Sequence, residues 1–317
     1  MKYRRLGRSA LQVSELCLGT MNFGPRTSAR DSHAILDAAV DLGINFIDTA
    51  NQYGGELGVG TTETIIGEWL AQHPAKRERI VLATKVHEPM SDDINDRGLS
   101  ARHIQMACEA SLNRLQVDHI ELYQLHHIDR AAPVEELMQA ADRLIAQGKI
   151  TYLGSSNFPG WKIAQLGERA RANGRLGPVA EQSLYNLIER RAELEVIPAA
   201  IEYGLGVIAW SPLAGGLLAG PSTGPGRRQD QALASERQAQ IARFTALCAD
   251  LGASPGAVAL AWLLHQPGLS AVIAGPASAE QLAGIAGVPE LALSTEVLAA
   301  LDEIFPPCGA APEAYAW

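Results

Sequence analysis

The stretch HIELYQLHHIDRAAPVEELMQAADRLIAQGKITYLG (119–154) contains one complete unit of the fold that we predict for this chain. The apolar run at 119–125 favours a buried strand, and a second such run follows at 150–154. Between them, after Pro133, apolar residues recur three and four positions apart, and Gly148 stands where a helix commonly ends. Strand, helix and strand in this order are typical of a βαβ unit with parallel strands.

The same alternation extends over most of the chain. Short runs rich in Val, Ile and Leu predict eight strands, at ELCLGT (15–20), INFID (44–48), RIVLAT (79–84), HIELYQL (119–125), ITYLG (150–154), PVAEQ (178–182), GVIAW (206–210) and SAVIA (270–274). We therefore predict an α/β fold, a (β/α)8 TIM barrel, in which residues 1–317 form a single domain with an extra N-terminal segment and a C-terminal tail. The Gly- and Pro-rich segment 214–229 is then a loop on the active face rather than an interdomain linker.

Individual residues mark the ends of several predicted helices. Ser100 precedes an apolar period and is a predicted N-cap, because its hydroxyl can accept from a free backbone N–H of the first turn. Gly43, Gly204 and Gly252 each follow such a period, where a glycine commonly terminates a helix.

Length and composition exclude several classes of protein. With 317 residues, of which 47% are apolar and 19% charged, the chain is long enough for one large core and is not of a disordered type. The net charge of −9 argues against a nucleic-acid or anionic-membrane partner. No apolar run has the length of a membrane helix. No apolar segment follows MKYRRLGRSA (1–10), so we expect no signal peptide and a cytoplasmic location.

Polar residues gather at the ends of three consecutive predicted strands. Asp48 ends the second run with Tyr53 in the loop after it, Lys85 directly follows the third run, and His126 directly follows the fourth. In a barrel, these residues point into one mouth, where the chemistry of the fold lies. Each of them alone is more often structural, but together they indicate a functional site. His127 competes with His126, because one of two neighbours points inward and spacing does not decide which.

These residue types favour proton transfer to or from an oxygen atom. A tyrosine hydroxyl has a pKa near ~10 in water, and a nearby lysine ammonium stabilises the phenolate and lowers that pKa. An aspartate holds the lysine in place and keeps it charged, while a histidine orients the substrate oxygen or helps to pass the proton. Such a group polarises a carbonyl as hydride arrives, or takes the proton of an alcohol in the reverse direction. We find no cluster of histidine, cysteine or acidic residues that predicts a metal site.

Four segments resemble the sequence motifs of the aldo-keto reductase family. GINFIDTANQYG (43–54) resembles the signature G-x-N-F-x-D-T-A-x-x-Y-G, and LATKV (82–86) resembles the segment that carries the family lysine. SLNRLQVDHIELYQLHHID (111–129) is similar to the block S-L-x-R-L-x-x-D-x-h-D-L-Y-x-x-H-x-x-D, and GKITYLGSSNF (148–158) to G-K-h-R-x-x-G-x-S-N-F. The likeness starts at LCLGTMNFG (16–24) and covers nearly the whole chain.

The resemblance implies a reductase of aldehydes or ketones that uses NADP, with NAD possible, and a small-molecule carbonyl or alcohol substrate. It assigns the catalytic roles to Tyr53, Lys85, Asp48 and His126. His126 is thereby favoured over His127. WSPLAGGLL (210–218) resembles the branch that includes bacterial reductases and potassium-channel β subunits, so a cofactor-binding sensor or regulatory subunit with slow turnover is the alternative function. The oligomeric state stays open.

The resemblance also implies which residues bind the cofactor and the substrate. Ser156, Asn157 and Gln182 correspond to the positions that hold the nicotinamide carboxamide, and Trp210 to the residue that stacks on the ring. Further cofactor contacts fall on Gly19, Met21, Asp48, Ser211, Pro212, Leu213, Gly215, Gly275, Ser278 and Gln281. The substrate pocket is formed by Tyr53, His126, Asn22, Phe23 and His87, and is bounded by the tail IFPPCGAAPEAYAW (304–317).

The segment AGPASAEQLAGIAG (274–287) departs from the family's adenosine-binding block G-x-x-S-x-E-Q-L-x-E-N, because Gly284 and Ile285 replace the Glu-Asn pair. No Arg or Lys stands where family members often bind the 2′-phosphate, and Arg227 and Arg228 are the nearest candidates by topology. NADP is therefore the family expectation for the cofactor, and NAD is the alternative.

Overall fold

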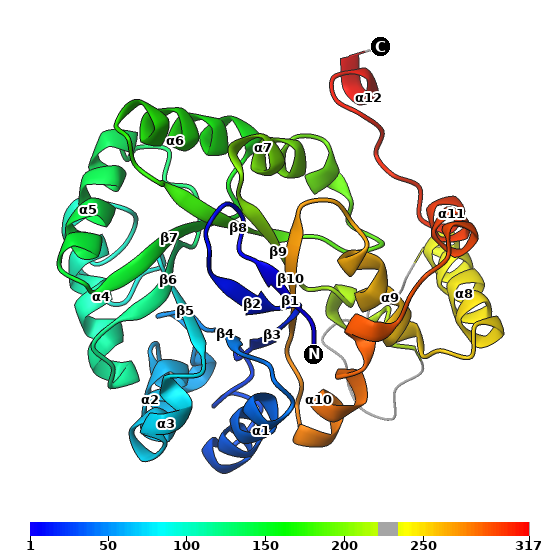
Figure 1. Cartoon of the computed structure of the whole chain (residues 1–317), viewed down its shortest axis with the longest axis horizontal. Coiled ribbons are helices and arrows are strands. Elements are labelled where there is room, and N and C mark those ends of the chain that lie inside the picture. Colours follow the sequence, from blue (N-terminus) through cyan, green and yellow to red (C-terminus); the bar gives the residue numbers. More distant parts are fainter. Residues whose placement is uncertain (221–233, 317) are drawn as a thin grey trace.

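Eight parallel strands close into a barrel at the centre of the molecule (Figure 1). The structure, a computed structural model, describes residues 1–220 and 234–316. The predicted (β/α)8 barrel is confirmed, and each predicted run forms one strand with ends within two residues of those expected. The strands are β3 (Leu16–Gly19), β4 (Phe46–Asp48), β5 (Val81–Val86), β6 (Ile120–Leu125), β7 (Ile150–Ser156), β8 (Pro178–Leu184), β9 (Gly206–Trp210) and β10 (Leu269–Ala274), and β10 pairs with β3.

Helices surround the barrel, as the apolar periods between the strands predict (Figure 1). The helices that follow the barrel strands are α1 (Ala29–Asp41), α2 (Thr61–Gln72), α4 (Ala101–Leu115), α5 (Val134–Ala146), α6 (Gly160–Ala172), α7 (Val196–Tyr203), α9 (Pro255–Leu264) and α10 (Ala279–Ile285). The other helices in the described ranges are α3 (Pro74–Arg77), α8 (Ser235–Asp250), α11 (Thr295–Ile304) and α12 (Glu313–Ala316). Short 3-10 turns are η1 (Gly55–Leu57), η2 (Arg191–Glu193), η3 (Ala214–Gly216) and η4 (Val288–Glu290).

The residues that mark helix ends in the sequence act as predicted. The Ser100 hydroxyl accepts a hydrogen bond from the backbone N–H of His103 and caps α4. Gly204 caps α7 with a left-handed φ of 70°, and Gly43 and Gly252 follow α1 and α8 with φ of 81° and 64°. A residue with a Cβ atom is strained at such positive φ values, whereas glycine is not. Glycine therefore fixes where these helices stop.

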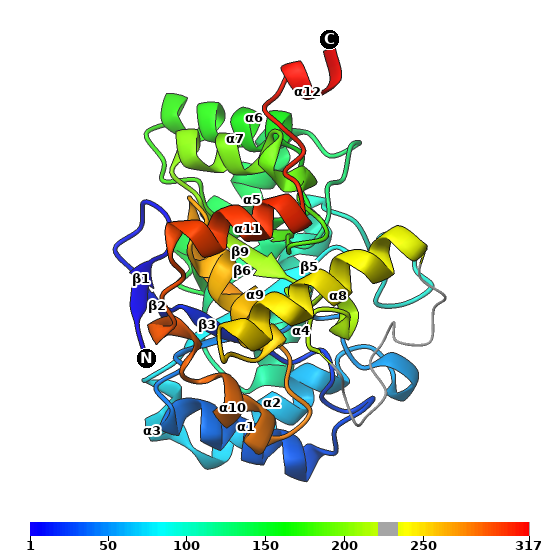
Figure 2. The ribbon, with the colours of Figure 1, turned by 90° about the vertical axis from the view of Figure 1, so that its right-hand side faces the viewer.

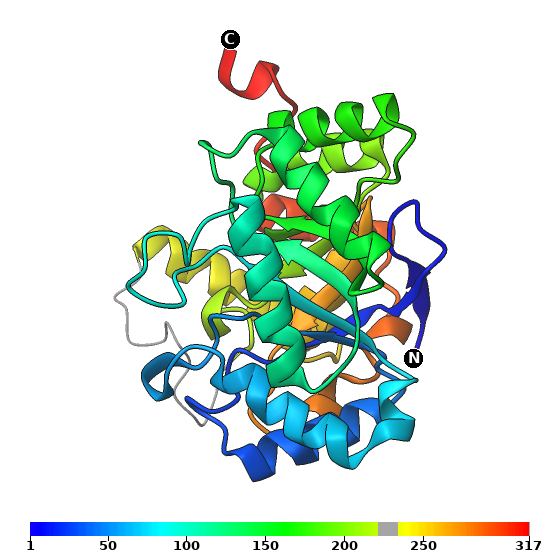
Figure 3. The same ribbon diagram turned by 90° about the vertical axis from the view of Figure 1, so that its left-hand side faces the viewer.

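The predicted N-terminal segment is an antiparallel hairpin of β1 (Tyr3–Arg5) and β2 (Gln12–Ser14). It lies across one end of the barrel in Figure 1 and at the edge of the molecule in Figures 2 and 3. Leu6 and Val13 of the hairpin are fully buried and pack with Phe46 and other apolar residues inside the barrel. The hairpin therefore closes this end with apolar side chains.

The turn of the hairpin depends on one glycine. Gly7 has φ +55°, and a Cβ atom there would lie 2.4 Å from the carbonyl oxygen of Val179. Its backbone thus approaches the barrel more closely than any side chain allows.

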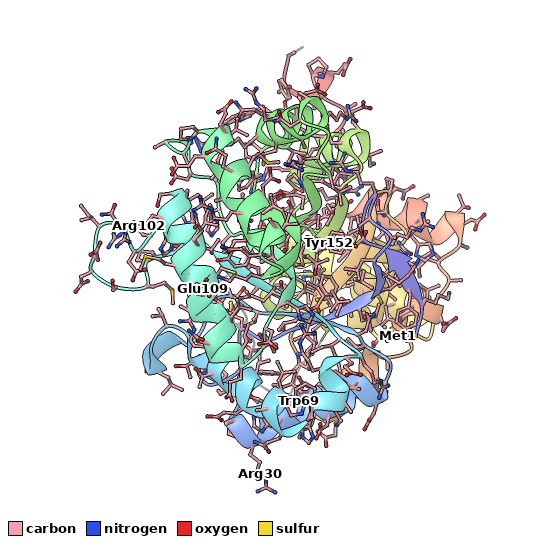
Figure 4. All side chains as sticks on the ribbon, turned by 60° about the vertical axis from the view of Figure 1, so that its left-hand side comes forward. Met1, Arg30, Trp69, Arg102, Glu109 and Tyr152 are labelled. Atoms are coloured by element: carbon pink, nitrogen blue, oxygen red, sulfur yellow. The ribbon has the colours of Figure 1, made fainter. Side chains whose placement is uncertain are left out.

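The larger hydrophobic core lies between the barrel strands and the helices. Trp69 of α2 is fully buried in it, and its indole N–H donates to Asp37 of α1 over 2.8 Å. Arg102 and Glu109, labelled with Trp69 in Figure 4, are exposed on the outward side of α4. The α4 sequence thus has the amphipathic pattern of a helix that covers a barrel.

The C-terminal segment packs beside α8 and then leaves the barrel. The ring of Phe305, just after α11, meets that of Phe244 in α8 edge to face, with centroids 5.7 Å apart. Helix α12 stands clear of the barrel in Figures 1 and 2, and the hydroxyl of Tyr315 donates to Glu195 over 3.1 Å. Within the described ranges, no one helix is long and apolar enough to cross a membrane; only α8 and α9 taken together pass that test, and they are bent by 91°.

Candidate active site

Lys85 is the centre of the polar cluster at the open end of the barrel. Lys85 lies inside β5, whereas the sequence analysis expects it directly after the strand. The difference arises because β5 extends two residues beyond the predicted run. Its ammonium is fully buried and donates to Asp48 Oδ2 over 2.6 Å, to the carbonyl oxygen of Thr49 over 2.7 Å and to the hydroxyl of Tyr53 over 3.3 Å. All three N–H groups of the ammonium are thus engaged.

Two opposing effects act on the charge of Lys85. Burial alone lowers its pKa, but the charge of Asp48 and the interactions with Asp48 and Tyr53 outweigh burial, so the pKa lies above the usual 10.5. The side chain is therefore a permanent cation that faces the phenol oxygen of Tyr53.

Tyr53 is held in the loop between β4 and α2. Its backbone N–H donates to the carbonyl oxygen of Ala50, and its carbonyl oxygen accepts from the N–H of Thr62. Gly54 follows with φ 156° and ψ −18°, and a Cβ atom there would lie 1.8 Å from the carbonyl oxygen of Gly58. The sharp turn at this glycine brings Tyr53 back towards Lys85.

His126 directly follows β6, as the sequence predicts, and its backbone N–H donates to the carbonyl oxygen of Val86. Its ring meets that of Tyr53 edge to face, with centroids 6.0 Å apart. The structure thus places His126 beside the tyrosine. His127 stacks on the outer side of His126 with centroids 4.9 Å apart, and its side chain is 43% exposed and pairs with Glu88.

The environment of His126 keeps its ring neutral. Burial, with the nearby charge of Lys85 as the next cause, lowers its pKa from 6.5 to about 2. Its Nδ1 atom is buried and makes no hydrogen bond to the described residues. A nitrogen in such a place is better left without a proton, which assigns the ring hydrogen to Nε2.

A second polar group lies behind Asp48 and includes a residue that the sequence analysis missed. Gln124 of β6 is fully buried and donates to Asp48 Oδ1 over 2.9 Å. Gln182 of β8, which the sequence predicts, donates to the same Asp48 oxygen over 2.9 Å and to Gln124 Oε1 over 3.1 Å. The signal for Gln124 was its spacing of two from His126, since alternate residues of a strand face the same side.

Asn157 connects the expected ring-stacking residue to the catalytic side of the barrel. It has a left-handed φ of 57°, and its Nδ2 donates to the carbonyl oxygen of His126 and to the hydroxyl of Ser156. Its Oδ1 accepts from the indole N–H of Trp210 over 3.0 Å. Ser156 in turn donates to the carbonyl oxygen of Gln182. These residues are brought together as predicted, but Asn157 already uses both of its amide hydrogens.

Glu181 is a second buried group that the sequence analysis missed. It has no exposed surface and accepts hydrogen bonds from the hydroxyls of Ser155 and Ser183 and from the N–H of Phe158. Burial raises its pKa from 4.5 to about 7, against the effect of these donors. The carboxyl group therefore ties the end of β7 to β8, next to the residues predicted to hold the cofactor.

The loop after β9 contains four predicted cofactor contacts. Ser211 has φ 53° and Gly215 has φ 71°, so the chain turns sharply twice. The side-chain N–H of Asn186 donates to the carbonyl oxygen of Ser211 and holds the first turn. Pro212 is buried and Leu213 half-buried between them. The candidates Arg227 and Arg228 lie outside the described residues.

The predicted residues at the end of β3 and in the loop after it divide into two groups. Gly19, the last residue of β3, lies against Ile273 of β10, and a Cβ atom at Gly19 would be 2.4 Å from Ile273 Cγ2. Met21 is exposed, and the side-chain N–H of Asn22 donates to the carbonyl oxygen of Gly275. Phe23 has no exposed surface and belongs to the hydrophobic core. Its predicted place in the substrate pocket is wrong in this structure, because the chain turns inward after the strand.

The remaining predicted residues lie at the rim. The Ser278 hydroxyl accepts from the N–H of Gln281 and caps α10, while Gln281 Oε1 accepts from the N–H of Ala277. Gly275 directly follows β10 and is exposed. His87 follows β5 and contacts Glu88 through Nδ1 at 3.3 Å. Among the residues that the structure describes, no group of three or more histidine, cysteine and acidic side chains is arranged to hold a metal ion.

The comparison with known families agrees with this geometry. The model of the aldo/keto reductase family matches residues 15–305. The chain belongs to the aldo/keto reductase family. Aldo/keto reductases use nicotinamide cofactors, and the barrel with its polar open end is that of an oxidoreductase of this family.

Three relatives show where the chain lies within the aldo/keto reductases. It is 49% identical to the uncharacterized oxidoreductase YrpG of Bacillus subtilis, over the full length of both chains. It is 32% identical to a probable voltage-gated potassium channel subunit beta of Oryza sativa, over 89% of each chain. It is 34% identical to the versiconal hemiacetal acetate reductase of Aspergillus parasiticus, over 84% of this chain and 86% of that one. The predicted branch, with bacterial reductases and channel β subunits, is confirmed.

The residues at the open end fit a nicotinamide group. A carboxamide needs both donors and acceptors. Gln182 uses both hydrogens of its Nε2 atom, and its Oε1 atom makes no hydrogen bond to the described residues, which leaves an acceptor for the carboxamide N–H. The indole of Trp210 is partly exposed at the end of β9 and is fixed by Asn157, so it offers a flat apolar surface for the ring.

Proposed function

We propose that this aldo/keto reductase reduces an aldehyde or ketone to an alcohol, or runs the reverse reaction, with NADP as cofactor and NAD as the alternative. The observation that carries the proposal is the hydrogen bond from the buried Lys85 ammonium to the Tyr53 hydroxyl oxygen. A bound reduced nicotinamide supplies the hydride to the carbonyl carbon. Tyr53 supplies the proton to the oxygen.

The contacts of Lys85 support this division of roles. Because its N–H groups are taken by Asp48, Thr49 and Tyr53, the ammonium has no hydrogen left for a substrate. The Tyr53 oxygen accepts from it, and the phenol O–H is the group that donates to the carbonyl oxygen. As the proton moves to the substrate, the ammonium stabilises the phenolate that remains, and Asp48 keeps the ammonium in place.

His126 then acts on the substrate oxygen as a neutral donor. With its pKa lowered to about 2 it carries no charge near neutral pH, and its Nε2–H donates a hydrogen bond to the carbonyl oxygen. Asn22 and His87 lie on the loops after β3 and β5 and border the substrate there.

Tyr53→Phe tests the proposal. The variant keeps the ring but lacks the proton, so turnover of an aldehyde panel falls by about 10²- to 10⁴-fold, as expected for loss of a general acid. Binding of NADPH, followed by its fluorescence, stays within about threefold of that of the unchanged protein, because the ring still packs in place. Turnover close to that of the unchanged protein contradicts the assignment.

The likeness to channel β subunits favours a second candidate function, a cofactor-binding subunit with slow turnover. The two candidates separate in one measurement. The protein is mixed with NADPH and a panel of aldehydes and ketones, and absorbance of the reduced cofactor is followed. Oxidation of cofactor by many turnovers supports the reductase, whereas tight retention without turnover on any carbonyl supports the subunit.

A further inference from the structure

Gln124 lies between the proposed catalytic group and the proposed cofactor site. Its Nε2 donates to Asp48 Oδ1 over 2.9 Å, and its Oε1 accepts from Gln182 Nε2 over 3.1 Å. Gln182 Nε2 also donates to the same Asp48 oxygen over 2.9 Å. The three side chains form a closed ring of hydrogen bonds, and none is more than 3% exposed.

The charge of Asp48 fixes the direction of both amides. Asp48 is paired with the Lys85 ammonium and accepts hydrogen bonds on both oxygens. An ionised carboxylate has no hydrogen to donate, so each amide must present its NH2 group to it. The oxygen of Gln124 then faces the second hydrogen of Gln182, and a reversed Gln182 amide would set its oxygen against two other oxygens.

The neighbouring strand makes room for the Gln124 side chain. Gln124 pairs with Gly154 of β7 in the strand register, and a Cβ atom at Gly154 would lie 3.1 Å from Gln124 Cγ. A larger residue at this position would displace the glutamine stem. The contact supports a fixed conformation of Gln124 rather than an adjustable one.

We propose that Gln124 is a positioning residue that holds the Gln182 amide with its oxygen towards the open end of the barrel. This rests on the proposed function, because the fixed oxygen is the acceptor for the carboxamide N–H of the nicotinamide cofactor. Gln124 thereby selects a ligand that donates at this point and disfavours one that does not. Without it, the second Gln182 hydrogen has no acceptor, and the one remaining hydrogen bond, to Asp48, no longer fixes the plane of the amide.

The acetylpyridine analogue of NADP⁺ provides the test, because an acetyl group keeps the oxygen of the carboxamide but replaces its NH2 by a methyl group. Dissociation constants of NADP⁺ and of the analogue are measured by quenching of tryptophan fluorescence. The unchanged protein binds the analogue about tenfold more weakly, since Gln182 Oε1 is left without a donor. In Gln124→Met the ratio of the dissociation constant of the analogue to that of NADP⁺ falls by at least about threefold, because the freed Gln182 amide can present an N–H to the acetyl oxygen.

Further variants show whether Gln124 acts through Gln182. Gln182→Met abolishes the preference for NADP⁺, and the double variant with Gln124→Met behaves as Gln182→Met alone. Gln266→Met is the control, since Gln266 is a half-buried, hydrogen-bonded glutamine far from Asp48 in the fold, and the ratio stays unchanged. Gln124→Asn, which is one methylene shorter, replaces Gln124→Met if the latter does not fold.

Each outcome has a distinct meaning. A ratio in folded Gln124→Met or Gln124→Asn equal to that of the unchanged protein overturns the role of Gln124 and leaves the proposed function standing. If the unchanged protein binds neither NADP⁺ nor NAD⁺, the proposed function fails and this inference fails with it. A change in the ratio when Gln124→Met is added to Gln182→Met also overturns the inference, because Gln124 would then act by another route.

Discussion

The indole N–H of Trp210 donates to the side-chain oxygen of Asn157 over 3.0 Å, and Asn157 donates in turn to the backbone of His126. The flat residue expected beneath the nicotinamide is therefore fixed to the same strand end that carries the histidine. The hydrogen bonds of Asn157 therefore fix the position of Trp210 relative to His126.

Trp210→Phe tests this connection. The variant keeps an aromatic face but loses the N–H, so the ring is no longer held by Asn157 and one hydrogen bond of about 1 kcal/mol is lost. NADPH affinity, measured by fluorescence titration, falls roughly fivefold. Trp161→Phe, at the exposed start of α6, is the matched control and leaves affinity unchanged. Equal affinities in both variants contradict the role of the Trp210 hydrogen bond.

Glu181 makes stability depend on pH. Its folded-state pKa of about 7 lies above the usual 4.5, so the folded state binds the proton more tightly. The stabilising contribution is complete below about pH 4.5 and is lost as pH rises through about 7, up to about 3 kcal/mol. Glu181→Gln removes this ionisation, so its free energy of unfolding relative to the unchanged protein rises between about pH 5 and about pH 8.

Urea denaturation at the two pH values measures this difference, with the exposed Glu303→Gln as control. Comparison with the unchanged protein cancels the titration of all other groups. A difference in unfolding free energy that stays constant with pH is the result that disagrees with the raised pKa.

His126 remains neutral through the physiological range. Burial and the nearby Lys85 lower its pKa to about 2. Its imidazole signals in NMR spectra, assigned by comparison with His126→Asn, therefore show no titration between about pH 5 and about pH 8. An inflection of these signals near pH 6 contradicts the environment described for His126.

Gly7 allows the hairpin to pack close against the barrel. Gly7→Ala places a methyl group against the carbonyl oxygens of Val179 and Gly204 at a positive φ, so we expect a loss of about 3 kcal/mol or more in unfolding free energy. Gly284→Ala is the matched control: it lies in α10 with no atom within 4 Å of the added Cβ and gains up to about 1 kcal/mol. The denaturation midpoints of the two variants are measured and compared. Similar stabilities of Gly7→Ala and Gly284→Ala refute the steric argument.

The sequence predicted the barrel well because its signals are local. Apolar runs gave all eight strands, and Ser100 and Gly204 marked helix ends through hydrogen bonds and φ values that depend on the residue itself. The catalytic candidates were found because strand ends of a barrel converge whatever the loops do.

The errors and omissions came from contacts between distant segments. Gln124 and Glu181 sit within apolar runs, and only the partners that they meet across the barrel show them to be polar connectors. Phe23 follows its strand as a pocket residue would, yet the loop turns it into the core. Gln124 had one local signal, its spacing of two from His126, whereas no local pattern marks Glu181 or Phe23 in this way.

The hairpin of β1 and β2 covers one end of the barrel with the buried side chains of Leu6 and Val13. The proposed site lies at the opposite end, where the loops that follow the strands meet. Substitutions in the hairpin are therefore expected to change stability and to leave ligand binding unaffected.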